Sequence, residues 1–511
     1  MKYRNPIISG FYPDPSICRV DNKFYLVSSS FNYFPGVPLF ESDDLINWEQ
    51  IGHVLTRKSQ LDLTDASTSG GIYAPTIRFH NGRFYMVTTN VNHGGNFYVW
   101  TDDIHGEWSD PIYVDQGGID PSLYFENDTA YFMSNGEDDR GVSGITQCVI
   151  DIETGHKLTS SKSLWQGAGG RYLEGPHLYK IDNYYYLMAS EGGTEYGHML
   201  VYARSKDIDG PYESYPNNPV LTNRNLGGYQ IQGCGHGDLV DDQSGNWWMV
   251  HLGFRQLDQW LQHHITGREV YLVPVKFDQN HWFTAGVNGT TRAEIETDQL
   301  PTNHKQKSPA DFRFDNTQLG KEWVFLRNPV KKNYDLTDNY LKLKTTSLTN
   351  EEKSNSPSMV LIRQCQLQIG LSVDIQTGHN EGGITLYMSD ELHYDLAVRR
   401  SANETFAFLR LRVGDACQIV HQVKIADTSA ELQPISLKID CTSYQYKFSV
   451  NYRDKIYELG SAQTKYLSSE VADNFTGVMI GLYAQQTVDE TQGEAVFSNF
   501  SYRNLPKKSE A

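Results

Sequence analysis

The chain has 511 residues, a formal net charge of −18 and an aromatic content of 12%. This length exceeds what one hydrophobic core supports, so we expect two domains. The negative charge argues against nucleic acid and anionic membranes as partners and favours a neutral substrate. No segment approaches the roughly 20 consecutive apolar residues that a membrane span requires.

The N-terminal segment MKYRNPIISGFYPDPS contains no apolar run of the kind found in signal peptides, so we expect a cytoplasmic protein. Its substrate should then be small enough to be imported. The six cysteines are scattered without a CxxC pair, and we interpret them as reduced packing residues. The sequence leaves the oligomeric state open, a homo-oligomer included.

One short pattern occurs five times within residues 14–253. Each copy has a small residue, usually followed by Pro, and then two strand-like segments around a tight turn. The second segment carries an aromatic residue at fixed spacing, the repeat aromatic: Tyr25, Tyr85, Tyr131, Tyr186 or Trp247. The copies open at Asp14, Ala74, Asp120, Gly175 and Gly237. Repeats of this length are typical of a β-propeller, in which each repeat forms one four-stranded blade. We therefore predict a five-bladed β-propeller over residues 1–300.

The turn inside each copy consists of residues that tolerate a positive φ, as tight hairpins require. These turns are Asp21-Asn22, Asn81-Gly82, Asn127-Asp128, Asp182-Asn183 and Gly245-Asn246. Strands should therefore flank each of these pairs.

The pattern changes after residue 300. Residues 301–310 are polar and contain Pro, which predicts a linker. Later segments such as YLKLKTT, LSVDIQTG and YKFSVNY alternate apolar and polar residues, and helical patterns are scarce. We predict that residues 311–511 form a β-sandwich of the jelly-roll, concanavalin-like type, so that the whole chain is all-β.

Three repeats carry an acidic residue at or beside their first position: Asp14, Asp120 and Glu174. Equivalent positions in a propeller meet at its central axis, so the fold should bring these carboxylates together. An inverting acetal cleavage needs one carboxylate to activate water and one protonated carboxyl group to protonate the leaving oxygen. A third carboxylate can raise the pKa of that acid. The alternative is that these residues only begin strands, because Asp is common at turns.

The motifs resemble glycoside hydrolase family 43, specifically its two-domain β-xylosidases and α-L-arabinofuranosidases. The resemblance rests on NPIISGFYPDPSI, GGIYAPTIRF, GGIDPSL, YLEGPHLYK, GHGDLV and, in the second domain, FRFDNTQLGKEWVFLRNP. It implies that Asp14 is the general base and Glu174 the general acid. It further implies that Asp120 tunes the pKa and the orientation of the acid.

The resemblance also implies roles for four other residues. Phe31 matches an aromatic residue of the sugar subsite, and Arg268 matches an arginine that faces the substrate hydroxyls and the carboxylates. Tyr73 stands where many β-xylosidases of the family carry Trp, which leaves the choice between xylose and arabinose open. His236 matches a histidine near the propeller centre that is associated with a calcium ion or ordered water; a hydrogen-bonded core histidine is the alternative. No cofactor is expected for the chemistry itself.

Together these features predict an inverting exo-glycosidase that releases single pentoses from the non-reducing ends of short xylo- or arabinoxylo-oligosaccharides. We expect β-D-xylosidase activity, with α-L-arabinofuranosidase as a second or the main activity. A non-catalytic carbohydrate-binding propeller and an endo-acting arabinanase are the rival interpretations. An exo-acting enzyme needs a wall that closes its pocket, and we expect the sandwich to supply it through Phe497, Phe500 and the loop around Gln485–Gly493.

Overall fold

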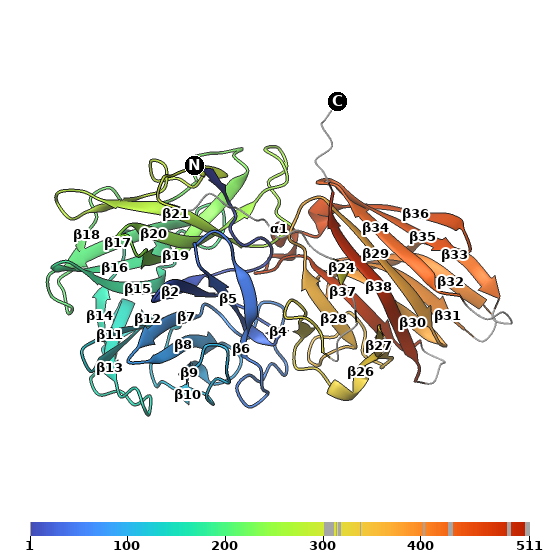
Figure 1. Ribbon diagram of the computed structural model, residues 1–511, viewed down its shortest axis with the longest axis horizontal. Coiled ribbons are helices and arrows are strands. Elements are labelled where there is room, and N and C mark those ends of the chain that lie inside the picture. Colours follow the sequence, from blue (N-terminus) through green and yellow to red (C-terminus); the bar gives the residue numbers. More distant parts are fainter. Residues whose placement is uncertain are drawn as a thin grey trace.

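The computed structural model describes residues 2–300 and 311–505, apart from 313, 315–317, 338, 402–403, 428–432 and 488–491. It is almost wholly β, which confirms the predicted class. Figure 1 shows two bodies, a propeller in blue to green and a sandwich in yellow to red, with the short helix α1 (Ser469–Ala472) between them. None of the helices described is long and apolar enough to cross a membrane. The predicted linker 301–310 lies outside the described residues.

The propeller contains one four-stranded sheet for each sequence repeat. The first sheet comprises β2 (Ser16–Val20), β3 (Lys23–Val27), β5 (Gly36–Ser42) and β6 (Glu49–Leu55), and the second comprises β7 (Thr76–His80), β8 (Arg83–Asn90), β9 (Gly95–Thr101) and β10 (Ile112–Tyr113). The third comprises β11 (Ile119–Glu126), β12 (Thr129–Glu137), β13 (Ser143–Ile150) and β14 (Lys162–Trp165). The fourth comprises β15 (Glu174–Ile181), β16 (Tyr184–Glu191), β17 (Met199–Ser205) and β18 (Glu213–Ser214), and the fifth comprises β19 (Ile231–Asp241), β20 (Trp247–Arg255), β21 (Glu269–Phe277) and β22 (Phe283–Ala285).

These sheets close into a ring. Their first strands contact one another in the order β2, β7, β11, β15 and β19, and β19 contacts β2 again. The N-terminal strand β1 (Lys2–Arg4) pairs with β23 (Glu294–Glu296) and so joins the two ends of the propeller segment. Aromatic side chains of the repeats pack between neighbouring sheets; the ring centroids of Tyr25 and Phe84, for example, lie 5.2 Å apart. The first strands therefore surround the axis, and the repeat aromatics hold the sheets together.

The five hairpin turns have the backbone that the sequence predicted. In the first four hairpins the first turn residue has a φ of 51°, 48°, 53° and 52° at Asp21, Asn81, Asn127 and Asp182, and Gly245, in the longer fifth connection between Asp241 and Trp247, has a φ of 81°. Asp, Asn and Gly are the residue types that enter this left-handed region at the lowest cost. Turn chemistry thus sets the register of the two inner strands in every sheet.

The second body consists of two antiparallel sheets that face each other (Figure 1). One sheet contains β26 (Tyr334–Thr337), β27 (Tyr340–Lys344), β38 (Glu494–Asn504), β29 (Ile369–Thr377), β34 (Ile435–Cys441), β35 (Gln445–Tyr452) and β36 (Lys455–Gln463), with β24 (Asp311–Phe312) beside β38. The other contains β28 (Met359–Arg363), β37 (Met479–Gln485), β30 (Asn380–Ser389), β31 (Leu392–Arg400), β32 (Glu404–Val413) and β33 (Ala416–Asp427). Two 3₁₀ turns, η1 (Lys331–Asn333) and η2 (Thr464–Tyr466), complete the body. Alternate side chains, such as Leu371 and Val373 of β29, form the core between the sheets.

The two bodies share a strand pair and an apolar core. The propeller strand β4 (Tyr33–Phe34) pairs with β25 (Phe325–Leu326), which leads into the sandwich. Behind this pair, Phe11 and Phe31 of the propeller belong to the same buried cluster as Met359 and other residues of the β28–β33 sheet. Because Phe31 is a predicted site residue, the sandwich is attached directly beside the predicted site.

Candidate active site

Four of the five repeats have a residue with an unusual backbone at or beside their first position. Asp14, Asp120 and His236 have φ values of 55°, 53° and 45°, and the aligned Gly175 has 60°. This conformation costs roughly 1–2 kcal/mol for a residue other than glycine, and such strain is concentrated at functional sites. The strand register also shifts just after Ile119 and Glu174, as in a β-bulge, which re-aims side chains. The strained backbone therefore directs polar side chains to the axis.

Asp14 is held as a carboxylate. Its Oδ1 accepts a 2.9 Å hydrogen bond from Arg268, and its Oδ2 accepts a hydrogen bond from Ser29. Burial raises the pKa of Asp14, but the charge of Arg268 and then His236 and Ser29 outweigh it, so that the pKa lies below its ordinary value. Asp14 is therefore ionised at neutral pH and can accept a proton.

Asp120 and Glu174 behave in the opposite way. Burial and then the charges of Glu174 and Asp14 raise the pKa of Asp120 well above its ordinary value. Burial and then the charge of Asp14 raise the pKa of Glu174 to about 7. Burial and neighbouring negative charge therefore favour the protonated form of both carboxyl groups. The structure thus brings the three predicted acids together and divides them into an ionised residue and a protonated pair.

Arg268 connects the acids to the aromatic side of the site. One of its terminal nitrogens donates to both Asp14 and the hydroxyl of Thr194, each at 2.9 Å. The other terminal nitrogen is buried and has no hydrogen-bond partner among the described residues. The guanidinium carbon lies 5.6 Å from the ring centroid of Phe31 and 5.0 Å from that of Phe475. A buried, unpartnered donor of this kind is suited to a hydroxyl group of a bound ligand.

Phe31, Tyr73 and Phe475 form an aromatic wall. The ring of Phe31 lies 5.5 Å from that of Tyr73 and 5.9 Å from that of Phe475, measured between centroids. Tyr73, Phe475 and Glu174 line a cavity of about 780 Å³ to which both bodies contribute. Phe31 is 2% exposed, so it supports the wall from behind more than it forms the surface.

The sandwich contributes residues to this cavity, but Phe497 and Phe500 are not among them. Phe497 and Phe500 are 0% and 1% exposed and lie in the core between the two sandwich sheets. They are three residues apart on β38, and an extra residue in the pairing with β29, between Ser498 and Ser501, lets both side chains face the core. Phe475 and the neighbouring residues after α1 reach the cavity instead. Of the loop Gln485–Gly493, residues 488–491 lie outside the described residues.

The backbone near Phe475 is fastened to the propeller next to Arg268. Val478 donates a 2.8 Å hydrogen bond to the carbonyl of Ile265, and Ser469 donates one of 3.2 Å to that of His264. The carboxylate of Glu470 accepts from the ring of His264 at 2.7 Å. These contacts hold the Phe475 segment over the mouth of the propeller.

His236 lies beside Asp14, with Nδ1 3.9 Å from Oδ1 of the carboxylate. Among the residues that the structure describes, no group of three or more His, Cys, Asp or Glu side chains could hold a metal ion. The nearby carboxylate of Asp14 is already paired with Arg268. The protein groups around His236 therefore do not fit a directly ligated calcium ion. A calcium ion held mainly by water stays a prediction.

Three site residues were missed by the sequence analysis: Ser29, Thr194 and Phe475. Ser29 could have been found, because it occupies the same repeat position as other polar residues four places after the repeat aromatic. Thr194 and Phe475 lie in loops outside the repeats and carry no comparable signal. They become site residues only through their contacts with Arg268.

Comparison with known proteins agrees with this architecture. The model of glycosyl hydrolases family 43 matches residues 3–283. The model of the β-xylosidase C-terminal concanavalin A-like domain matches residues 311–503, which confirms the predicted type of the second domain.

Several relatives match over nearly their whole length. A non-reducing end α-L-arabinofuranosidase of Bacteroides ovatus is 38% identical over 98% of this chain and 95% of its own. A xylosidase/arabinosidase of Butyrivibrio fibrisolvens is 36% identical over 98% and 99%, respectively. Among solved structures, xylan β-1,4-xylosidase from Bacillus halodurans superposes with a TM-score of 0.91 at 30% identity, covering 98% of this chain and 100% of its own. The chain therefore belongs to glycosyl hydrolases family 43 and is a glycoside hydrolase.

Proposed function

We propose that this glycoside hydrolase is an inverting exo-enzyme that removes single pentoses from the non-reducing ends of short xylo- or arabinoxylo-oligosaccharides. The main support is the electrostatic division of one site into an ionised Asp14 and a protonated Asp120–Glu174 pair. Single displacement needs these two states at the same time, a base for water and an acid for the leaving oxygen.

In this mechanism Asp14 takes a proton from a water molecule while the oxygen of that water attacks the anomeric carbon. Glu174, which lines the cavity, donates its proton to the glycosidic oxygen as the bond to the aglycone breaks. Burial and the charge of Asp14 keep the pKa of that acid high, and Asp120, whose own pKa is raised by burial and by the charges of Glu174 and Asp14, helps to orient it. The unpartnered nitrogen of Arg268 binds a sugar hydroxyl, so the cation both orients the substrate and keeps Asp14 ionised.

The exo mode of action is supported by the wall between the two bodies. Phe475 faces Tyr73 at 6.2 Å between ring centroids, which encloses one side of the cavity. A cavity of about 780 Å³ suits a short saccharide better than a long chain passing through. Short substrates agree with the expected cytoplasmic location, which is part of the same proposal.

The choice of pentose follows from the relatives, whose names include both xylosidase and arabinofuranosidase. A terminal β-D-xylopyranose and a terminal α-L-arabinofuranose present similar hydroxyl groups around the anomeric carbon, so one pocket can bind both. Tyr73 has a smaller ring than Trp and adds a hydroxyl group near the acids. We propose β-D-xylosidase activity together with α-L-arabinofuranosidase activity.

The deciding experiment compares turnover of an aryl β-D-xylopyranoside and an aryl α-L-arabinofuranoside by the pure protein. Proton NMR of the first product then reports its anomeric configuration, and we expect inversion. Retention of configuration would refute single displacement. Equilibrium binding of xylobiose without turnover of either glycoside would favour the non-catalytic carbohydrate-binding alternative.

A further inference from the structure

The second strand of every repeat carries a polar side chain four residues after the repeat aromatic. These residues are Ser29, Thr89, Asn135, Ser190 and His251. Ser29 donates a hydrogen bond to Asp14, and Ser190 accepts one of 2.6 Å from the backbone N–H of His236. In these cases the position contacts a residue at or directly before the start of a repeat, either in its own sheet or in the next one.

Asn135, on β12, makes such contacts to two sheets at once. Its Oδ1 accepts a 2.9 Å hydrogen bond from the N–H of Ile119, and its Nδ2 donates one of 3.2 Å to the carbonyl of Leu173. Asp120 directly follows Ile119, and Glu174 directly follows Leu173. Because a donor and an acceptor face the amide group from different sides, its orientation is defined. One side chain therefore fastens the backbone next to both acids.

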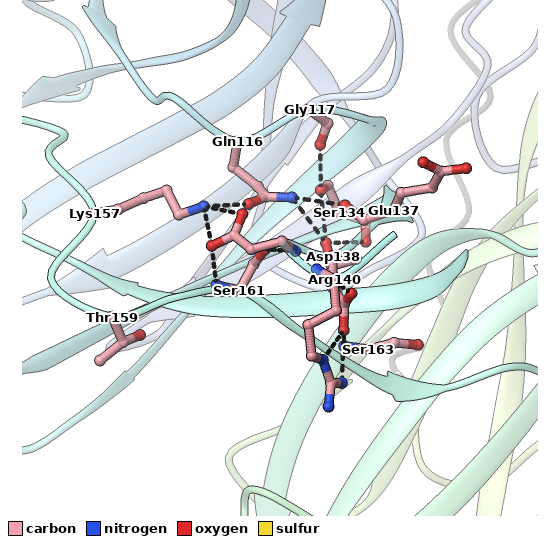
Figure 2. A network of polar contacts seen from close by, with 12 residues as sticks. Gln116, Gly117, Ser134, Glu137, Asp138, Arg140, Lys157, Thr159, Ser161 and Ser163 are labelled. Carbon is pink, nitrogen blue, oxygen red and sulfur yellow. Dashed lines mark hydrogen bonds and ion pairs between the residues drawn. The ribbon is translucent and has the colours of Figure 1, made fainter. Parts of the chain in front are cut away.

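The backbone around Asn135 is itself anchored, as Figure 2 shows for its neighbourhood. The hydroxyl of Ser134 donates a 2.8 Å hydrogen bond to the carbonyl of Gly117, and Lys157 donates one of 3.0 Å to the amide oxygen of Gln116. The segment that leads to the aspartate of the third repeat is thus held at several points. The bond from Asn135 to Leu173 extends this restraint to the fourth sheet.

We propose that Asn135 is a positioning residue that fixes the separation of Asp120 and Glu174 by bonding to the backbone next to each. This inference rests on the proposed function, in which Glu174 donates the proton. Repulsion between two charges depends on the distance between them, so their separation governs how firmly the pair holds a proton. A fixed separation also keeps Glu174 within reach of the leaving oxygen.

The charged and titratable groups that face the acid pair include Asp14, Arg268 and Tyr73. Their contributions stay in place when Asn135 is replaced, because none of them bonds to its amide among the hydrogen bonds of the described residues. A change in the pH profile of an Asn135 variant therefore reports on the acid pair itself.

The chain offers a matched control in Asn223, a buried amide that also bridges two backbone segments. Its Oδ1 accepts a 2.9 Å hydrogen bond from the N–H of Thr291, and its Nδ2 donates to the carbonyls of Ile231 and Thr291, each at 3.0 Å. Neither neighbour adjoins one of the three acids. Asn223→Ala thus loses the same kind of contact as Asn135→Ala without touching the acid pair.

The experiment measures thermal stability and the pH profile of kcat/KM on xylobiose for three variants. Both alanine variants should lose stability. Only Asn135→Ala should lose kcat/KM, by about 10- to 100-fold because the acid is misplaced, and its alkaline limb should move to lower pH. Asn135→Asp keeps the shape and the bond to Ile119 but adds a negative charge beside the pair, so its alkaline limb should move to higher pH.

Equal activity losses in Asn135→Ala and Asn223→Ala, with unmoved alkaline limbs, would overturn the inference. If Asn135→Ala does not fold, an unmoved limb in folded Asn135→Asp overturns it equally. Glu174→Ala distinguishes this failure from that of the proposed function. If the alkaline limb disappears in Glu174→Ala but is unmoved in the Asn135 variants, only the role of Asn135 is refuted. If the alkaline limb is still present in Glu174→Ala, the assignment of Glu174 as the acid is refuted.

Discussion

The first and third repeats of the propeller place an aspartate at the same position and give it different chemistry. Asp14 and Asp120 have almost the same backbone, with φ values of 55° and 53°. Arg268 lies beside Asp14 and the pKa of that residue is lowered, whereas Glu174 lies beside Asp120 and the pKa is raised. The repeat thus supplies the location of a carboxylate, and the neighbouring charge decides its protonation state.

Replacing Asp14, the ionised aspartate, should lower activity more than any other change considered below. Asp14→Asn keeps the size of the side chain but cannot accept the proton of the water, so kcat should fall by about 10³-fold or more. The measurement is kcat on an aryl β-D-xylopyranoside, with circular dichroism as the control for folding. A variant that keeps more than a tenth of the wild-type kcat would show that Asp14 is not the base.

Replacing Arg268 should make the pKa of Asp14 resemble the raised pKa of Asp120. Without Arg268 the burial and the charges around Asp14 remain, so Arg268→Gln should raise the pKa of Asp14. Because Asp14 must be ionised, the acid limb of kcat/KM should move to higher pH, and kcat/KM should fall by about 100-fold. A pH profile measures both effects, and an acid limb at its wild-type position would contradict this account.

Phe475 of the sandwich covers the guanidinium group of Arg268. The guanidinium carbon lies 5.0 Å from the centroid of the Phe475 ring. Phe475→Ala should therefore open the wall and raise KM by about 10-fold, while kcat changes little because the acids stay in place. Tyr466→Ala is a suitable control, since that aromatic residue lies nearby in the chain, is 42% exposed and does not line the cavity. Equal KM values in the two variants would exclude a role for Phe475 in substrate binding.

The smallest expected effect concerns stability. The pKa of Glu174 rises from an ordinary 4.5 to about 7 on folding, so the native state binds more protons than the unfolded state between these values. Stability should then decrease as pH rises through this window. Glu174→Gln removes the titration and should stabilise the protein at pH 8 by on the order of 1–3 kcal/mol. Denaturant unfolding at pH 4.5 and pH 8 tests this, and equal effects at both values would contradict the raised pKa.

Much of the site could be predicted from the sequence because the repeats are local. A small residue, a strand and a turn that tolerates positive φ occupy consecutive positions, and their recurrence identified the sheets and the meeting of Asp14, Asp120 and Glu174. Ser29 and Asn135 follow the same logic, since they share one repeat position. What repetition could not provide was the partner of each residue in the neighbouring sheet.

In the sandwich, the sequence pattern did not predict which aromatic residues reach the active-site cavity. It gave no means to decide whether Phe497 and Phe500 faced the core or that cavity. Both lie in the core. Phe475 follows the only α-helix of the described residues and carries no periodic signal. Its place in the wall depends on packing against a propeller loop about 200 residues earlier in the chain.

The sequence by itself therefore determined the class of fold, the turns and the three carboxylates that converge, because these depend on short-range patterns repeated along the chain. Only the tertiary structure decided that the pKa of Asp14 is lowered, that the pKa values of Asp120 and Glu174 are raised and that Phe475 lines the cavity. Protonation and closure depend on burial and on charges brought together from distant segments. Such distances do not exist until the chain has folded.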